Sequence, residues 1–295
     1  MGEGQAIDSR RYIVALELRS KDDCPPDFEL PASLAGFDAG LFLPRDSPDW
    51  FGRSSYPPRI LLLQGDALSV LSHPSAGEAP CRCALERISS VESGHMLLKG
   101  WLRFTGADLD YTVRYNTRGF PSVSRFLHRF RNQLLWRTQP RLAAELHFGA
   151  ELDLKFTNAL AQELDPEEIV SMRFFQPPKE PRSQTWLLPR RRWIAGDLLA
   201  LTSRRLLWIT DRERGTYARY GTVASYAPCD AVRSIDLNSS REGGILRVLL
   251  NNGSAWQVPI AAGSRVEPGR LAEDFAAALE IEKRRNEAGR TEVRQ

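Results

Sequence analysis

The sequence predicts a mainly β protein (α+β class) made of two similar units, each a set of short antiparallel strands that ends in one α-helix. Three observations predict this architecture. The chain has 295 residues, about twice the ~150 residues typical of a single domain. Its two halves repeat one pattern of apolar segments in the same order. Within each half, short apolar runs alternate with turn residues and are followed by one amphipathic stretch.

The repeat begins with matching apolar segments. Residues 41–45 have the sequence LFLPR, and residues 186–190 have WLLPR. Further along, residues 60–73 align without a gap with residues 198–211, apolar on apolar at most positions. In each of these longer segments a short polar stretch separates two apolar runs, so each is expected to form a β-hairpin.

The later parts of the two halves also correspond. Residues 85–92 match residues 229–236, and residues 100–105 match residues 244–249. Both halves then end in an expected helix that follows a proline, with apolar residues three or four positions apart on one face. These apolar residues are Val123, Phe126, Leu127, Phe130 and Leu134 in the first half, and Leu271, Phe275, Ala278 and Leu279 in the second.

The repeat sets the expected domain boundaries: a first domain over 10–137, a linker over 138–163, a second domain over 164–282 and a charged tail over 283–295 that frays. The linker is expected to contain a helix, because Leu152, Phe156, Leu160 and Leu164 are four residues apart.

Composition and motifs exclude several classes of function. The net charge is +3, from 40 basic and 37 acidic residues, and no nucleic-acid-binding motif is present, so nucleic acid is not an expected partner. Cys81 and Cys83 have no second cysteine pair, and the histidines are scattered, so no metal is expected. No nucleophile motif or phosphate loop occurs, and no apolar run approaches the ~20 residues of a membrane span. We therefore expect a non-catalytic, cytoplasmic protein without a cofactor.

Three segments of the second half carry a family resemblance. Residues 164–168 (LDPEE) precede residues 199–211, which contain the pattern hydrophobic-Thr-x-Arg-Arg-hydrophobic, and residues 231–236 follow with an isoleucine near the strand end. On these residues the second half, 164–282, resembles the bacterial PH-like and GRAM-like domains of the pleckstrin-homology superfold, and residues 10–137 are similar at fewer positions. The resemblance implies a tandem duplicate of PH-like antiparallel barrels or sandwiches, each of roughly seven strands and capped by a C-terminal helix.

Basic residues concentrate between residues 182 and 219, which contain nine arginines and three acids. Arginine presents forked donors that suit a phosphate or a carboxylate, and in the resembling family the turns between early strands are where anionic headgroups dock. The candidate site for an anionic lipid or an acidic partner consists of Arg190, Arg191, Arg192, Trp193, Arg204, Arg205, Arg212 and Arg214. The alternative explanation is that these arginines are solvated residues of loops and strand edges.

Two functions remain open at this point. Members of the resembling family mostly bind lipid headgroups, phosphopeptides or protein surfaces. The first interpretation is a protein–protein interaction scaffold or adaptor, since two linked units can present two binding faces. The second is a peripheral membrane protein at the inner membrane face, which binds anionic lipid headgroups through the basic loops of the second domain. The sequence does not indicate the oligomeric state or which protein the partner is.

Overall fold

The protein is described by a computed structural model, which confirms that the fold is mainly β. It divides into two compact units, Met1–Ile88 with His95–Trp136 and Ser89–Gly94 with Arg137–Gln295. The structure describes residues 14–45, 56–135, 146–178, 195–213, 216–217, 221–240, 243–261 and 267–293. Within these ranges no sheet closes on itself into a barrel.

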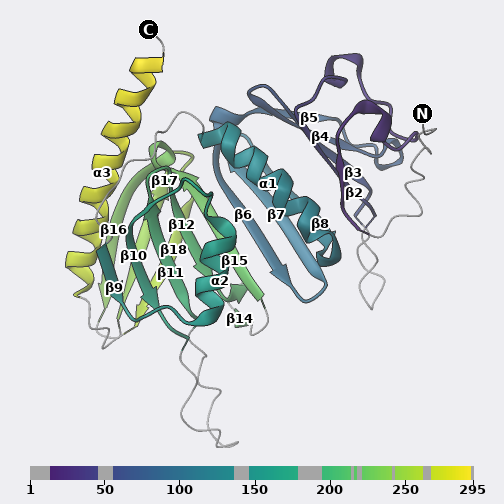
Figure 1. The fold of residues 1–295 in the computed structure, drawn as a ribbon. Coiled ribbons are helices and arrows are strands. Elements are labelled where there is room, and N and C mark those ends of the chain that lie inside the picture. The colour runs from purple at the N-terminus through teal and green to yellow at the C-terminus, as the bar shows by residue number, and fades with distance from the viewer. Residues whose placement is uncertain are drawn as a thin grey trace, which may run out of the picture. The chain divides into compact units, whose positions relative to one another are not determined.

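In the first unit, five strands form an antiparallel sheet in chain order, and further strands and a helix follow (Figure 1). The sheet consists of β1 (Leu16–Leu18), β2 (Ala39–Leu43), β3 (Arg59–Gln64), β4 (Ala67–Ser72) and β5 (Cys81–Ala84). After it come β6 (Ile88–Met96), of which Ser89–Gly94 belong to the second unit, β7 (Lys99–Gly106), β8 (Asp110–Asn116) and α1 (Phe120–Leu135). Short 3₁₀ turns lie at Lys21–Asp23, Ala32–Leu34, Pro74–Ala76, Leu85–Arg87 and Thr117–Gly119.

The second unit places strand β9 and helix α2 before its main sheets. In one sheet the strands follow the order β15-β12-β11-β10-β9, with β9 parallel to β10, and β16-β17-β18 form a second, antiparallel sheet. The elements are β9 (Leu146–Gly149), α2 (Leu154–Glu163), β10 (Val170–Gln176), β11 (Asp197–Thr202), β12 (Arg205–Thr210), β13 (Arg212–Glu213), β14 (Thr216–Tyr217), β15 (Gly221–Pro228), a 3₁₀ turn (Cys229–Ala231), β16 (Val232–Ser240), β17 (Gly243–Leu250), β18 (Ala255–Ala261) and α3 (Pro268–Val293).

Both predicted hairpins are confirmed. Strands β3 and β4 are antiparallel neighbours with Ile60 opposite Leu71. Strands β11 and β12 are paired in the same way, with Leu198 opposite Ile209. A continuous apolar run on both sides of a polar turn therefore formed the same local structure in each half, as the alignment of the halves predicts.

The core of the second unit lies between its two sheets and α3. One cluster of buried residues joins Phe174 of β10, Leu199 of β11, Val248 of β17 and Val258 of β18 to Phe275 of α3. In Figure 1 the helix, drawn in yellow, extends along the strands of this unit. Leu271, Phe275 and Leu279 are buried and Ala278 is partly buried, so the predicted apolar stripe is the face of α3 that covers the sheets.

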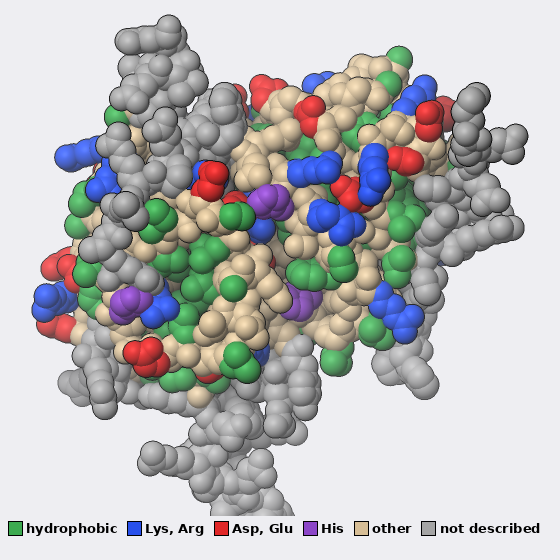
Figure 2. Space-filling model, viewed as in Figure 1, with side chains coloured by type: hydrophobic (Ala, Val, Ile, Leu, Met, Phe, Trp, Pro, Cys, Tyr) green, Lys and Arg blue, Asp and Glu red, His purple; other side chains and the backbone are tan. Residues whose placement is uncertain are grey.

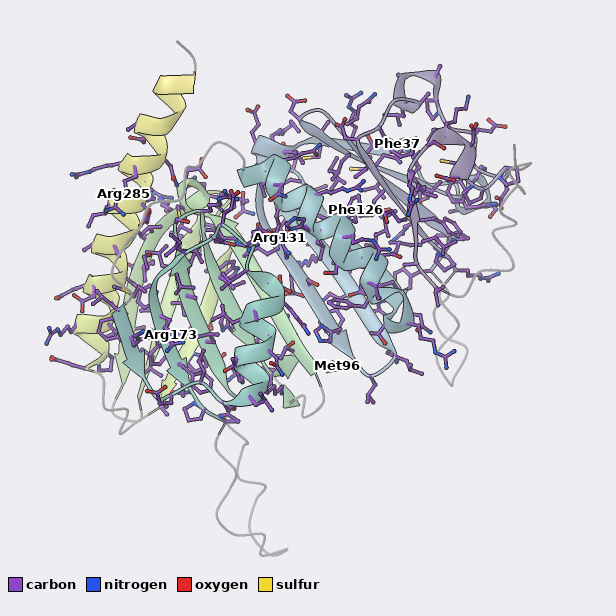
Figure 3. All side chains as sticks on the ribbon, in the orientation of Figure 1. Phe37, Met96, Phe126, Arg131, Arg173 and Arg285 are labelled. Atoms are coloured by element: carbon purple, nitrogen blue, oxygen red, sulfur yellow. The ribbon has the colours of Figure 1, made fainter. Side chains whose placement is uncertain are left out.

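Helix α1 has the same role in the first unit. Val123, Phe126, Leu127 and Phe130 are all buried, as the helical spacing predicts, and Leu134 is half-buried. Figure 3 labels Phe126 on this helix. Phe130 meets Phe104 of β7 edge-on, with ring centroids 5.4 Å apart, so the helix is fixed to the strands by aromatic packing as well as by aliphatic burial.

Two of the expected boundaries differ from the structure. The predicted linker does contain a helix, α2, but it also supplies β9, which pairs with β10 from Leu146 opposite Met172 onward. The predicted fraying tail is helical as far as Val293. The buried stripe of α3 continues into this tail, because Glu282, just before it, and Asn286, within it, are only 5% and 6% exposed. The apolar pattern predicts too early an end for this helix, because polar side chains continue the helical spacing of the buried face.

Three short hairpin turns of the described ranges contain a residue with positive φ, and the turn between β3 and β4 has Gly65 at +57°. In the turn between β17 and β18, Gly253 has φ +83° at no steric cost. In the turn between β6 and β7 the residue is Leu97, with φ +50°, and it is the only non-glycine residue with positive φ in the described ranges. Left-handed backbone costs an L-residue ~1–2 kcal/mol, so the surrounding contacts must hold this turn in place.

The covering role of α3 can be tested by truncating one buried ring. Phe275→Ala should lower the free energy of unfolding by about 3–5 kcal/mol, because it removes a fully buried aromatic side chain and leaves a cavity. Urea unfolding followed by circular dichroism would measure the loss. Ala277→Ser, on the exposed face of the same helix, should change stability by less than ~0.5 kcal/mol. Similar losses for both variants would show that α3 does not cover the core through this stripe.

Candidate functional site

The predicted arginine site falls partly outside the described residues. Arg190, Arg191, Arg192, Trp193 and Arg214 all lie there. The structure places the other three members of the candidate site, and their surroundings decide which of them can meet a partner.

Arg205 is enclosed in the second unit, which corrects its prediction as a docking residue. Its side chain has no exposed surface. Its guanidinium binds the Glu168 carboxylate twice, Nε to Oε1 at 2.8 Å and Nη2 to Oε2 at 2.5 Å. The same Nη2 donates to the Glu163 carbonyl at 2.5 Å, and the guanidinium lies over the Tyr226 ring, 4.9 Å from its centroid. A bidentate ion pair without solvent contact positions secondary structure and offers nothing to an external anion.

The carboxylate of Glu168 is held by a complete set of donors. Thr202 Oγ1 donates to Oε1 at 2.6 Å, and the Asp165 backbone amide donates to Oε2 at 3.2 Å. Burial acts to raise the pKa of Glu168, but Arg205 and these hydrogen bonds outweigh it, and the pKa is lowered. Arg205 likewise loses hydration on burial, yet Glu168 raises its pKa. Both groups therefore stay charged, and the pair ties the segment before β10 to the start of β12.

Arg204 and Arg212 do not form one surface with each other. Arg204 is 8% exposed, with Nη2 3.4 Å from Oε2 of the exposed Glu167. Arg212 lies past the other end of β12, with Nη2 3.9 Å from Asp197 Oδ2. Strand β12 separates them by about 20 Å at ~3.3 Å per residue. Arg204 and Arg212 therefore lie at opposite ends of the sheet, and each has its own acidic partner. They do not form one binding surface.

Two buried acids occupy the end of the second unit where β11 begins and β12 ends. Asp197 and Asp211 both have fully buried side chains. Asp197 Oδ1 accepts from Trp208 Nε1 at 3.0 Å. Asp211 Oδ1 accepts from the Gly196 amide at 2.7 Å, and Oδ2 accepts from Lys155 Nζ of α2 at 3.2 Å. These acids, which the sequence-based argument counted only as charges, neutralise the basic side chains beside them.

Burial perturbs both carboxyls. It raises the pKa of Asp197 to about 6, against the opposing effects of Arg212 and of the hydrogen bonds to Thr210 and Trp208. It also raises the pKa of Asp211, against the opposing effect of Lys155. An acid whose pKa is about 6 changes its charge at mildly acidic pH.

The first unit carries a buried cation at one end of its sheet. Arg59, at the start of β3, is 7% exposed. Its Nη2 binds both carboxylate oxygens of Glu78 at 3.1 Å, and its Nη1 donates to the Thr112 carbonyl at 3.0 Å. Ser72 Oγ donates to Glu78 Oε2 at 2.5 Å. The hydrogen bond from Ser72, aided by Arg59, lowers the pKa of Glu78 although partial burial opposes the change.

Aromatic rings complete the surroundings of Arg59. Its guanidinium lies 5.0 Å from the centroid of Tyr111 and 5.8 Å from that of Tyr56, and Arg114 lies 4.6 Å from Tyr56 on its own account. The side chain of Glu78, in contrast, is 42% exposed. Contacts inside the unit therefore hold the guanidinium of Arg59 in place, whereas the Glu78 carboxylate that neutralises it lies on a loop at the surface. A carboxylate or phosphate group from outside could take the place of Glu78 there.

The two sheet ends are equivalent in the repeat but opposite in charge. Arg59 and Asp197 are the first residues of β3 and β11, and the ungapped alignment of the two hairpins matches them. Each is buried and each is neutralised by a partner of the opposite sign. Sequence comparison alone contained this signal, because Arg59 aligns with Asp197, but it could not show that both side chains are buried.

The described surface gives no other site of a recognised kind. Over the described ranges, no three His, Cys, Asp or Glu side chains gather as metal ligands, and none of the helices there is long and apolar enough to span a membrane. On the face shown in Figure 2, Lys and Arg side chains are interspersed with Asp and Glu over both units. Asp108 and Asp110 lie at the β7–β8 hairpin tip, where they pair with Arg87 and Arg103.

Comparisons with known proteins add no family assignment. The chain matches no protein-family model, and no curated protein matches its sequence. Inference about function therefore rests on the repeat within the chain and on the contacts described above.

The enclosed ion pair predicts strong coupling between its two members. Glu168→Gln should destabilise the second unit by about 3–5 kcal/mol, because it leaves the Arg205 charge buried without compensation. The double variant Glu168→Gln with Arg205→Met should recover more than half of that loss, since the uncompensated guanidinium is removed together with its partner. A double-mutant cycle by urea unfolding measures the coupling; additive losses would mean that the two side chains act independently.

The buried acid predicts a pH dependence of stability. Because the pKa of Asp197 is about 6 in the folded state and 3.8 as its ordinary value, the folded state binds this proton more tightly, and the contribution of Asp197 to stability should fall as the pH rises from about 4 to about 6. Asp197→Asn should raise the free energy of unfolding at pH 7 by about 1–3 kcal/mol and should have little effect at pH 4. Glu273→Gln on exposed α3 surface serves as the matched control. A variant that keeps the wild-type slope between pH 4 and pH 6 would contradict this.

Proposed function

We propose that this chain is a non-catalytic tandem PH-like binding module that acts as a protein interaction scaffold or adaptor. The fold assignment is supported by the order of elements. In the second unit, β10, β11, β12 and β15 precede β16, β17 and β18, and α3 follows. In the first unit, β2 to β5 precede β6, β7 and β8, and α1 follows. Apart from β1 in the first unit and β9, β13 and β14 in the second, each series has seven strands followed by one helix, which is what the resemblance to the pleckstrin-homology superfold implies.

The observation that carries the scaffold function is the opposite charge at equivalent sheet ends. If both units bound one anionic lipid headgroup, both would need a cation at that end. Arg59 is suited to an acidic group, because the Glu78 carboxylate that it binds is 42% exposed. Asp197 and Asp211 are fully buried acids with partners inside the second unit, so they offer an anionic group no cation there. A chain whose two units differ at this end suits an adaptor, because one unit binds the acidic group and the linked second unit remains available for another partner.

In this proposal the Arg59 end of the first unit takes an acidic side chain of a partner protein. Glu78 holds that place in the unbound chain, and it must move for the partner carboxylate to bind. The exchange replaces one charge-assisted bidentate contact with another. Its specificity comes from Tyr111 and Tyr56, whose rings hold the guanidinium in a single orientation.

A second candidate is peripheral association with an anionic membrane through the basic loop of the second unit. Its support is the run Arg190-Arg191-Arg192 beside Trp193, which combines phosphate donors with a ring suited to the membrane interface. Basic residues close to an anionic surface each gain ~1 kcal/mol. This candidate comes second because Arg205 is enclosed and because charges of both signs are interspersed on the face in Figure 2.

The scaffold function is tested by affinity capture with the full tagged chain at moderate salt. A specific partner should be retained more strongly by Glu78→Ala, which removes the competing carboxylate, and less by Arg59→Lys, which cannot bind a carboxylate in the forked manner. Quantitative mass spectrometry of the captured proteins, with a change of at least about fivefold expected in each direction, measures this. Glu86→Ala removes an exposed acid of the same unit and should leave capture unchanged.

Dependence of vesicle sedimentation on Arg190, Arg191 and Arg192, together with the capture result, decides between the two candidates. If no protein depends on Arg59 and Glu78 while the chain sediments with phosphatidylserine vesicles, the membrane candidate replaces the scaffold. In that case replacing Arg190, Arg191 and Arg192 by Glu should abolish sedimentation. High salt should release the wild-type chain, because screening at 1 M shortens to ~3 Å.

A further inference from the structure

The turn between β6 and β7 exposes two adjacent leucines in the first unit. Leu97 is 75% exposed and Leu98 is 59% exposed. The other strongly exposed large hydrophobic residues in the described ranges stand singly: Leu146, Leu154, Ile245 and Ile281. Figure 3 labels Met96, the last residue of β6, at the lower tip of this hairpin. The two leucines therefore form the apolar end of a hairpin rather than part of a core.

Contacts from the segment before α1 hold this turn in its unusual conformation. The Thr117 amide donates to the Leu98 carbonyl at 3.1 Å, and the Thr117 hydroxyl donates to the Leu97 carbonyl. Leu97 has φ +50°, a value at which glycine or asparagine would be favoured. A bulky apolar side chain at this position works against local backbone preference, which points to a role for the side chain itself.

The matching turn of the second unit serves as an internal comparison. Strands β16 and β17 are also separated by two residues, and those residues are Arg241 and Glu242 in the sequence. The two residues between these strands are therefore not required to be leucine. The apolar pair belongs to one copy of the repeat only, and folding of the repeat gives no reason for it.

The surroundings of the leucines are basic. Lys99 directly follows them and Arg118 lies one residue past Thr117, and both side chains are exposed. The sequence contains no acid between Glu92 and Asp108, nor between Asp110 and the end of α1. This hairpin end thus differs from the face in Figure 2, where charges of both signs are interspersed.

We propose that the Leu97–Leu98 turn inserts into the interfacial layer of an anionic membrane, with Lys99 and Arg118 at the lipid phosphates. A protruding pair of aliphatic side chains flanked by cations suits a lipid surface, where apolar groups enter the acyl boundary and basic groups stay at the headgroups. Protein hot spots favour tryptophan, tyrosine and arginine, with leucine under-represented. The proposal goes beyond the scaffold function and does not depend on it, because membrane binding through this turn requires no protein partner.

The test compares full-length chains in sedimentation with large vesicles of phosphatidylcholine, with and without phosphatidylserine. The wild type should bind the vesicles that contain phosphatidylserine. The double variant Leu97→Asn with Leu98→Ser should bind them at least about tenfold more weakly, which corresponds to ~1.4 kcal/mol. Asparagine tolerates positive φ, so the turn should persist, and an unchanged thermal midpoint verifies this. Lys99→Gln with Arg118→Gln should reduce binding only when phosphatidylserine is present.

Leu154→Ser is the matched control, because Leu154 is 76% exposed but lies in the second unit; it should bind vesicles as the wild type does. The proposal is overturned if the wild type does not bind, or if the Leu97/Leu98 variant binds as well as the wild type. Loss of binding only on replacement of Arg190, Arg191 and Arg192 would assign the membrane contact to the second unit instead. If the leucine variant keeps vesicle binding but loses a captured protein, the turn is a protein contact and the proposal is likewise wrong.

Discussion

Burial of apolar sheet faces beneath a terminal helix is the constraint on which the rest of the structure depends. A strand pair with an apolar face is unstable in water until something covers that face. In the second unit the two sheets and α3 share one core around Phe275. In the first unit Phe126 and Phe130 bring α1 onto the strands in the same way. With the apolar faces committed to this packing, variation between the units is left to strand ends and turns.

Charges close the sheet ends that apolar residues do not fill. Glu168 and Arg205 join the segment before β10 to the β11–β12 turn without contact with water, and Arg59 with Glu78 closes an end of the first unit. The two pairs differ in what they can do. The first has no exposed side-chain surface, so it specifies geometry. The second has one exposed member, so its cation remains within reach of a competing anion.

Divergence between the copies is the physical basis for assigning them different roles. Equivalent positions hold Arg59 in one unit and Asp197 in the other, and equivalent turns hold Leu97-Leu98 and Arg241-Glu242. None of these differences is required by the shared packing.

The sequence by itself determined the elements that local pattern controls: the paired hairpins at Ile60–Leu71 and Leu198–Ile209, the buried stripes of α1 and α3, and the helix within the linker. Periodicity suffices there because the residues that define each element are neighbours along the chain. Only the tertiary structure decided that Arg205 is enclosed, that Asp197 is buried and that β9 joins the sheet through β10. A charged residue looks the same in sequence whether it faces water or a counter-charge dozens of residues away, and only the folded chain brings that counter-charge within hydrogen-bonding distance.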